Sequence, residues 1–107
     1  MKLIKVYQCL CDETRLRILY LLTQTPLSVS QLQEILELHQ VKISKHLAYL
    51  KERDMVEVKR EGNRMIYSLP KEIPQELDAN LKCLHDCVME SSIFCKDLEK
   101  LEVRGKK

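Results

Sequence analysis

The segment HQVKISKHLAYLKERD, residues 39–54, decides how the rest of the chain folds around it. Ile43, Leu47 and Leu50 recur at the i, i+4, i+7 spacing of a helix that buries one face. Most other positions in the segment are polar or basic, and neither glycine nor proline interrupts it. The pattern predicts a helix that packs on a core along one face and exposes a polar, basic face.

A second helix is expected directly before this segment. It begins at Ser28 or Ser30, a residue type that caps helix N-termini, and only residues 37–39 separate it from the next helix. Two short helices with such a short link are typical of a helix-turn-helix. The inward-facing side chains of the earlier helix are expected to be Leu32, Ile35 and Leu36.

A β-hairpin is expected directly after residue 54. The runs MVEVKR and RMIYSL alternate in polarity on either side of the turn EGN. The tip of this hairpin is basic, with Lys59, Arg60 and Arg64. A helix-turn-helix followed by a basic hairpin predicts a winged helix-turn-helix, a mainly α fold of the α+β type.

Further helices are expected before this unit. Residues 2–11 form a short amphipathic helix, and Asp12 is suited to cap the next one, in ETRLRILYLL. This second helix is apolar on most sides and ends at Thr25-Pro26, because a residue before proline is disfavoured in the α region. The apolar face of the first helix is expected to hold Leu3, Tyr7 and Leu10.

The chain is expected to end in two helices after a turn at residues 70–74. The first covers residues 75–90, and the last runs from a cap at Ser91-Ser92 to Leu101. The apolar stripe of the first of these helices is Leu77, Leu81, Leu84 and Val88.

Length and composition limit the class of protein. The 107 residues suffice for one domain, residues 1–107, and a net charge of +2 means that an anionic partner needs a local basic patch. No segment approaches the roughly 18 apolar residues of a membrane span, and charged residues interrupt the N-terminus too early for a signal peptide. We therefore expect a cytoplasmic protein, in which the five cysteines serve metal binding or redox chemistry and not disulfide bonds.

The polar face of residues 39–54 has the chemistry of DNA recognition. The second helix of a helix-turn-helix enters the major groove of double-stranded DNA, where Gln40 can pair with adenine, and Lys42 and Lys45 can reach guanine or phosphate. A single surface lysine is usually only solvated, so the inference rests on helix, turn, helix and basic hairpin together. The further candidates for phosphate contact are Ser44, His46 and Tyr49 on the helix and Lys59, Arg60 and Arg64 on the hairpin.

The runs DETRLRILYLL, LSVSQLQEILEL and VKISKHLAYLKERDMVEVKREGNRMIYSL, in this order, resemble the ArsR/SmtB family of bacterial metal-sensing repressors. The resemblance covers about residues 5–70. It implies a homodimer held by the first and last helices, here residues 1–11 and 75–101, with residues 28–69 binding DNA. It also implies a repressor that needs no cofactor to hold its operator, which overlaps its own promoter, and that a toxic metal or metalloid ion releases.

Three places depart from the family's pattern. Many arsenic and cadmium sensors carry Cys-Val-Cys where this chain reads Ser28-Val29-Ser30. A small residue that is common in the helix-turn-helix turn is Glu37 here, and a serine that is common at the next helix start is His39. The thiol site of those sensors is therefore absent, and the turn is where local geometry is expected to differ.

The remaining cysteines are the candidates for the inducer site. Cys83 and Cys87 are i, i+4 and share a helix face beside the apolar stripe, although a dimer interface could bury them as small hydrophobic residues. Two thiolates do not complete a site for a soft ion. Cys95 is the first candidate for the third ligand, provided that the chain bends at Ser91-Ser92.

Cys9 and Cys11, at the end of the first helix, are the alternative third ligands. By its position Cys11 is expected to be half core, whereas Cys9 points off the apolar stripe. Three sulfur ligands suit trivalent arsenic, antimony or another soft metal better than a borderline ion.

Two other classes of protein would also use these cysteines. A redox or persulfide sensor of the same fold would use two of the cysteines, and a structural zinc domain would use Cys9, Cys11, Cys83 and Cys87 to stabilise the fold. An enzyme is not expected, because Cys83 and His85 are i, i+2 and face different directions, and there is no glycine-rich phosphate loop.

Overall fold

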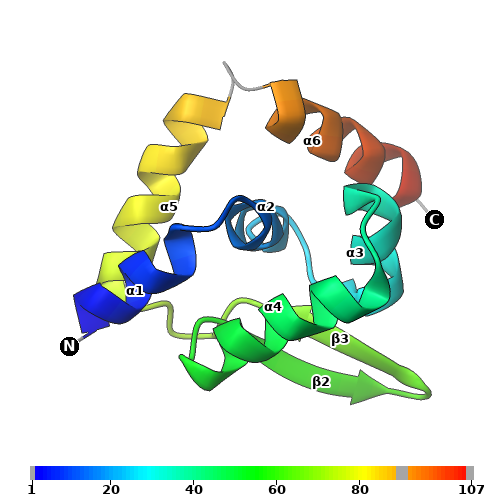
Figure 1. Cartoon of the computed structure of the whole chain (residues 1–107), viewed down its shortest axis with the longest axis horizontal. Helices are drawn as coiled ribbons and strands as arrows, with labels where there is room; N and C mark the ends of the chain where they lie inside the picture. Colours follow the sequence, from blue (N-terminus) through cyan, green and yellow to red (C-terminus); the bar gives the residue numbers. More distant parts are fainter. Residues whose placement is uncertain (1, 89–91, 106–107) are drawn as a thin grey trace.

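A computed structural model describes residues 2–88 and 92–105, with side chains for residues 3–84, 93 and 95–103. Figure 1 shows a group of helices with a β-hairpin along one side. The fold is a mainly helical winged helix-turn-helix, as the sequence predicted. The elements are α1 (Lys2–Leu10), α2 (Glu13–Leu22), β1 (Leu27–Ser28), α3 (Val29–Leu36), α4 (Gln40–Glu52), β2 (Glu57–Glu61), β3 (Arg64–Ser68), α5 (Gln75–Val88) and α6 (Ser92–Gly105).

Helix α2 lies at the centre of the fold, with α1, α4, α5 and α6 packed around it (Figure 1). Asp12 caps its N-terminus, because the Asp12 carboxylate accepts the Arg15 backbone N–H at 3.1 Å. All residues from Ile18 to Leu22 are buried, since neighbouring elements cover α2 on several sides. The predicted cap and the predicted burial of this helix are both confirmed.

Helices α3 and α4 form the helix-turn-helix. Ser28 caps α3 through a capping box: its hydroxyl accepts the Gln31 N–H, and the Gln31 side chain accepts the Ser28 N–H. The predicted inward-facing side chains are buried in both helices, at Leu32, Ile35, Leu36, Ile43, Leu47 and Leu50. Apolar spacing alone was enough to predict this packing.

Strands β2 and β3 form the predicted hairpin, called the wing from here on. They pair antiparallel from Glu57 opposite Ser68 to Glu61 opposite Arg64. Gly62 opens the two-residue turn with φ of 62°, a conformation that glycine adopts without steric cost. The sequence did not predict β1, which pairs with β3, because two residues are too short to show an alternating pattern.

The buried face of α1 differs from the predicted one. Val6 and Cys9 are fully buried, whereas Tyr7, expected on the apolar face with Leu3 and Leu10, is 54% exposed. The cause is tertiary, because α1 packs against both α2 and α5 and turns the i, i+3 pair Val6 and Cys9 toward them. The prediction for Tyr7 was therefore wrong.

Ion pairs hold helix α6 to α2 and to the helix-turn-helix. Arg17 of α2 and Asp97 of α6 form two 2.8 Å hydrogen bonds, with side-chain exposures of 11% and 3%. Lys100 of α6 also pairs with Glu37, in the turn between α3 and α4. Helix α6 thus packs on α2 and α3, while α1 packs beside α5.

The ends of α5 and α6 also bear on the sequence predictions. Leu77 and Leu81 of the predicted stripe are buried, and α6 continues to Gly105, beyond the predicted end at Leu101. The last two residues predicted for α5, 89 and 90, and Ser91 of the predicted bend lie outside the described residues, whereas Ser92 is the first residue of α6.

The two departures in the helix-turn-helix turn have visible consequences. Glu37 adopts the left-handed conformation, with φ of 56° and ψ of 46°, and its N–H bonds to the Gln33 carbonyl. A small residue suits this place because a Cβ atom costs energy there. His39 stands at the N-cap of α4 but makes no side-chain capping bond.

Replacing Glu37 by glycine is expected to raise the free energy of unfolding by about 1 kcal/mol, because glycine adopts the left-handed conformation without strain. The lost ion pair with Lys100 should matter little, since the Glu37 side chain is 72% exposed. Denaturant unfolding measures the change. Glu37→Gln is the control, because it loses the ion pair and keeps the strain. If the glycine variant were less stable than the glutamine variant, backbone strain at residue 37 would not be limiting.

Candidate functional site

The outer face of α4 is polar and open to solvent. Gln40, Lys42, Ser44 and Lys45 are all exposed, whereas the Ile43 stripe is buried. These four side chains are therefore free of the core and can reach a partner.

The wing continues this surface. Lys59, Arg60 and Arg64 are exposed, and Arg64 donates to the Ser28 hydroxyl at 3.1 Å, which ties the wing to the start of α3. Gln40 and Arg64 line the same hollow of about 230 Å³, so the start of α4 and the wing turn border one another. The exposed start of α4 and the basic wing thus form one continuous surface.

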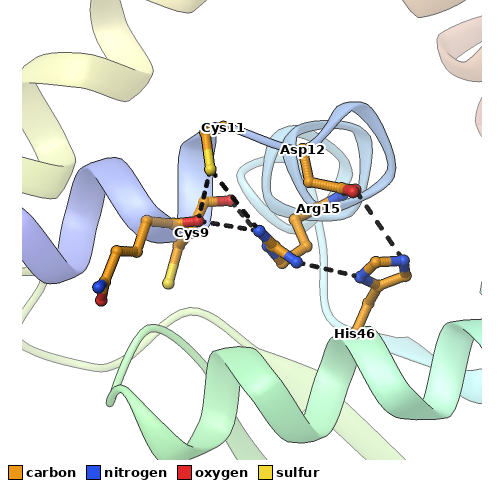
Figure 2. A network of polar contacts seen from close by, with 6 residues as sticks. Cys9, Cys11, Asp12, Arg15 and His46 are labelled. Carbon is orange, nitrogen blue, oxygen red and sulfur yellow. Dashed lines mark hydrogen bonds and ion pairs between the residues drawn. The ribbon is translucent and has the colours of Figure 1, made fainter.

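His46 and Tyr49 are placed differently from the other candidates. Both are half-buried, and both contact Arg15 of α2 (Figure 2 draws His46). The Tyr49 ring lies between two guanidinium groups, with Arg15 at 4.1 Å and Arg53 at 3.5 Å from the ring centroid. These two side chains fix α4 on the body of the fold.

Arg15 connects the end of α1 to α4, as Figure 2 shows. Its guanidinium donates to the carbonyls of Gln8 at 2.9 Å and Cys9 at 3.2 Å, which are among the last carbonyls of α1. It also donates to Nδ1 of His46 at 3.4 Å. One side chain therefore joins the first helix to the helix with the polar face.

The protonation state of His46 follows from these contacts. Arginine has no acceptor, so Nδ1 of His46 must accept, and the proton lies on Nε2, which is 3.9 Å from the Asp12 carboxylate. Burial lowers the pKa of His46, as do the charges of Arg15 and Lys42, while Asp12 opposes them. The neutral imidazole is thereby favoured.

Cys9 and Cys11 are the reverse of what their sequence positions predicted. Cys9 lies in the core, and burial raises the pKa of its thiol, which disfavours the thiolate that binds metals. Cys11 lies just beyond α1 and is exposed, donating to the Gln8 carbonyl at 3.2 Å. The reversal has the same cause as that of Tyr7, the rotation of α1 toward α2 and α5.

The other cysteines lie on α5 and α6. Cys83 is exposed, so its predicted position beside the apolar stripe is confirmed, and Cys95 is half-buried. Tyr20 of α2 packs against Leu84 of α5 and against Ile93 and Leu98 of α6, so both helices meet at this side chain. Burial raises the pKa of Tyr20, and the nearby Cys95 adds to this.

The side chain of Cys87, and those of His85 and Asp86, lie outside the described residues. Among the side chains that the structure describes, no three Cys, His, Asp or Glu residues lie close enough to hold a metal ion.

Comparison with known proteins assigns this arrangement to a family. Residues 12–58 match the family described as bacterial regulatory protein, arsR family. The chain is 42% identical over 86 residues to the arsenic resistance transcriptional regulator ArsR1 of Pseudomonas putida. The aligned region covers 79% of this chain and 67% of that protein. This chain belongs to the ArsR family.

Solved structures of similar proteins have the same winged fold. HlyU from Vibrio cholerae superposes on this ArsR-family chain with a TM-score of 0.73, at 32% identity over 80% of this chain and 90% of HlyU. The homodimeric winged helix-turn-helix DNA-binding domain Mb0332 from Mycobacterium bovis gives a TM-score of 0.68, at 25% identity over 83% and 80% of the two chains.

Membership in the ArsR family makes the chain a DNA-binding transcriptional regulator and not an enzyme. None of the helices in residues 2–88 and 92–105 is long and apolar enough to cross a membrane.

Sequence reasoning about this ArsR-family chain missed Arg15 and Arg53 as partners of α4. The Arg15 contacts depend on how α2 and α4 lie in space, because no spacing rule brings together residues 31 positions apart, such as Arg15 and His46. Tyr49 and Arg53 are i, i+4, so helical spacing could have found that pair. It also missed Val41, an exposed residue of α4. A helical projection could have found Val41, since two residues of 100° place it about 200° from Ile43.

Proposed function

We propose that this chain is a homodimeric transcriptional repressor that a thiophilic metal or metalloid ion releases from its operator. The observation that carries the proposal is the exposed polar face of α4, with Lys42 and Lys45, beside the basic wing in an ArsR-family fold. In this arrangement residues 28–69 bind double-stranded DNA, and α4 enters the major groove. His46 and Tyr49 act mainly by holding α4, and phosphate contact is a secondary role for them.

Dimerisation is assigned to residues 1–11 and 75–101. Ile4 and Tyr7 of α1 are exposed apolar side chains on a helix that packs beside α5, and a second protomer would cover them. The M. bovis neighbour, which is described as homodimeric, supports this assignment.

The inducer site is assigned to Cys83, Cys87 and Cys95. Exposure of Cys83 on α5, and the meeting of α5 and α6 at Tyr20, support a site that draws thiols from both helices. The likeness to an arsenic resistance regulator favours trivalent arsenic or antimony as the ion. Cys11 is the alternative third ligand, because burial argues against Cys9.

Helix α6 supplies a route from this site to the DNA-binding face. Cys95 is two residues from Asp97, which binds Arg17 of α2, and Lys100 on the same helix pairs with Glu37 in the helix-turn-helix turn. An ion that moves α6 therefore changes contacts of both α2 and the turn.

Titration of the purified protein with arsenite, in the presence of a labelled operator duplex, tests the proposal. The operator is obtained by selecting bound duplexes from a random library. We expect tight binding without metal and release at about one ion per protomer. Release by an oxidant or persulfide with no response to arsenite would instead favour the thiol redox sensor, and a protein that binds no duplex would refute the DNA-binding proposal.

The wing is expected to bind DNA without reading its sequence. Arg60 is exposed, and within the described part of the chain it bonds only in the wing turn, to the Gly62 carbonyl at 3.1 Å, so its charge is placed for phosphate. Replacing Arg60 by alanine should weaken binding to the operator and to random DNA by the same factor. It should also reduce the slope of log affinity against log salt by about 1.8, because each protomer loses one phosphate contact. Arg64→Ala serves for comparison, because it also removes the bond to Ser28. A loss confined to the operator would show that the wing reads sequence.

A further inference from the structure

We infer that Val41 contacts a thymine methyl group in each operator half-site and is thus a specificity-determining residue. The inference rests on the proposed function, since it requires α4 to lie in the major groove.

Val41 lies near the middle of the face of α4 that points away from the core. It is 63% exposed, whereas Ile43, two residues later, is fully buried. At about 100° per residue, Lys45 lies about 40° and Ala48 about 20° from the direction of Val41. Both of these residues are exposed. The face that would meet DNA therefore has an exposed valine near its centre, with Lys45 and the small Ala48 on the turns that follow.

In the free protein, a valine at position 41 does not stabilise the fold. Its branched Cβ atom loses side-chain freedom in a helix, and its methyl groups remain in water. Single exposed apolar residues are common on protein surfaces and need no explanation by themselves. The position of Val41, in the first turn of α4, is what distinguishes it from Val103, a more exposed valine on α6.

The major groove offers one apolar group to such a side chain, the C5-methyl group of thymine. Residues in the first turn of a recognition helix contact base edges, and Gln40, directly before Val41, is suited to pair with adenine. Neighbouring Cα atoms are about 3.8 Å apart, close to the 3.4 Å rise between bases. The thymine is therefore expected at the base pair that Gln40 contacts or at the next one.

The surrounding charges favour DNA over an apolar protein as the partner of Val41. Lys42 and Lys45 are exposed on the same helix, and the basic wing, with Arg60 and Arg64, borders the start of that helix. An apolar protein partner would have to desolvate these cations without compensating charge, whereas DNA phosphates neutralise them.

Thymine-to-deoxyuridine substitution tests the inference, because it removes one methyl group and changes no hydrogen-bonding group. Each thymine of the duplex selected by the wild-type protein is replaced in turn, in one half-site and then in both. At one position we expect about a fourfold loss of affinity per half-site, or about fifteenfold in both. The fourfold loss corresponds to about 0.8 kcal/mol, the value for one buried CH₂ group.

The Val41→Ala variant is expected to show a smaller difference between the thymine and deoxyuridine duplexes than the wild type, because alanine offers less apolar surface to the methyl group. Val103→Ala, the same change at a valine that is 78% exposed on α6, is the matched control and should keep the full wild-type sensitivity. Unfolding measurements should show that Val41→Ala is as stable as the wild type, since alanine favours the helix.

Each contrary result would lead to a different conclusion. If no thymine methyl matters to the wild type, or if Val41→Ala keeps the same sensitivity, the inference fails while the proposed function stands. If Val41→Ala instead dissociates the dimer, Val41 serves the protein interface and the inference also fails. If the wild type selects no duplex at all, the proposed function fails as well.

Discussion

Replacing Lys42 and Lys45 together by alanine is expected to weaken operator binding by two to three orders of magnitude at about 0.2 M salt. Both ammonium groups lie on the exposed face of α4, so a dimer would lose four phosphate contacts. Each lost contact reduces the slope of log affinity against log salt by about 0.9, or about 3.6 in total. Fluorescence anisotropy with a labelled operator, measured over a range of salt concentrations, gives both the affinity and the slope.

The control for this pair is the double variant Lys71→Ala/Lys96→Ala. It removes the same charge from exposed lysines that are not part of α4 or the wing, one in the loop before α5 and one on α6. We expect this variant to keep nearly the wild-type salt slope. An unchanged affinity and slope in the Lys42/Lys45 variant would show that α4 is not the DNA-reading helix.

The helix-turn-helix could be predicted because its residues obey local rules. Ile43, Leu47 and Leu50 follow the helical period and are buried as that period requires. The capping residues Asp12 and Ser28 likewise act within their own helix turns. Where a residue's environment is set by its own element, sequence spacing is a reliable guide.

The cysteines show where such spacing fails. Cys9 and Cys11 were assigned from the apolar pattern of the first helix alone, but α2 and α5 cover the side that holds Cys9. Six of the nine residues of this helix are apolar or cysteine, and they spread over more than half of its circumference, so its neighbours decide which side is buried. Exposure of Cys83 was predicted correctly, because the longer α5 has a clear stripe at Leu77 and Leu81.

The attachment of α4 to the rest of the fold could not be predicted from spacing. Arg15 reaches the end of α1, His46 and Tyr49, and these contacts depend on how three helices cross. The sequence did indicate that His46 and Tyr49 lie at the edge of the buried stripe of α4, but it did not indicate their partner in α2. Their half-burial against α2 explains why a polar residue at the edge of a recognition helix can serve the fold and not the DNA.

Replacing Cys83 or Cys87 by serine is expected to abolish release by arsenite while leaving metal-free operator binding unchanged. In the wild type, arsenite should weaken operator binding by about 5- to 150-fold, the range of a coupling free energy of about 1–3 kcal/mol. Cys83 is exposed on α5, away from α4 and the wing, so its loss should not disturb the DNA-binding face. Operator affinity measured with and without arsenite gives the coupling for each variant.

The third thiolate is identified by single serine variants at Cys95 and Cys11, measured in the same way. If α5 and α6 together hold the ion, Cys95→Ser loses the response and Cys11→Ser keeps it, whereas the opposite result moves the third ligand to the end of α1. Cys9 is a poor choice for this test, because a hydroxyl in its fully buried place would destabilise the fold by itself. If the Cys83 and Cys87 variants still leave DNA when arsenite is added, the ion binds elsewhere. In that case the contacts of α6 with Arg17 and Glu37 do not transmit its binding from this site.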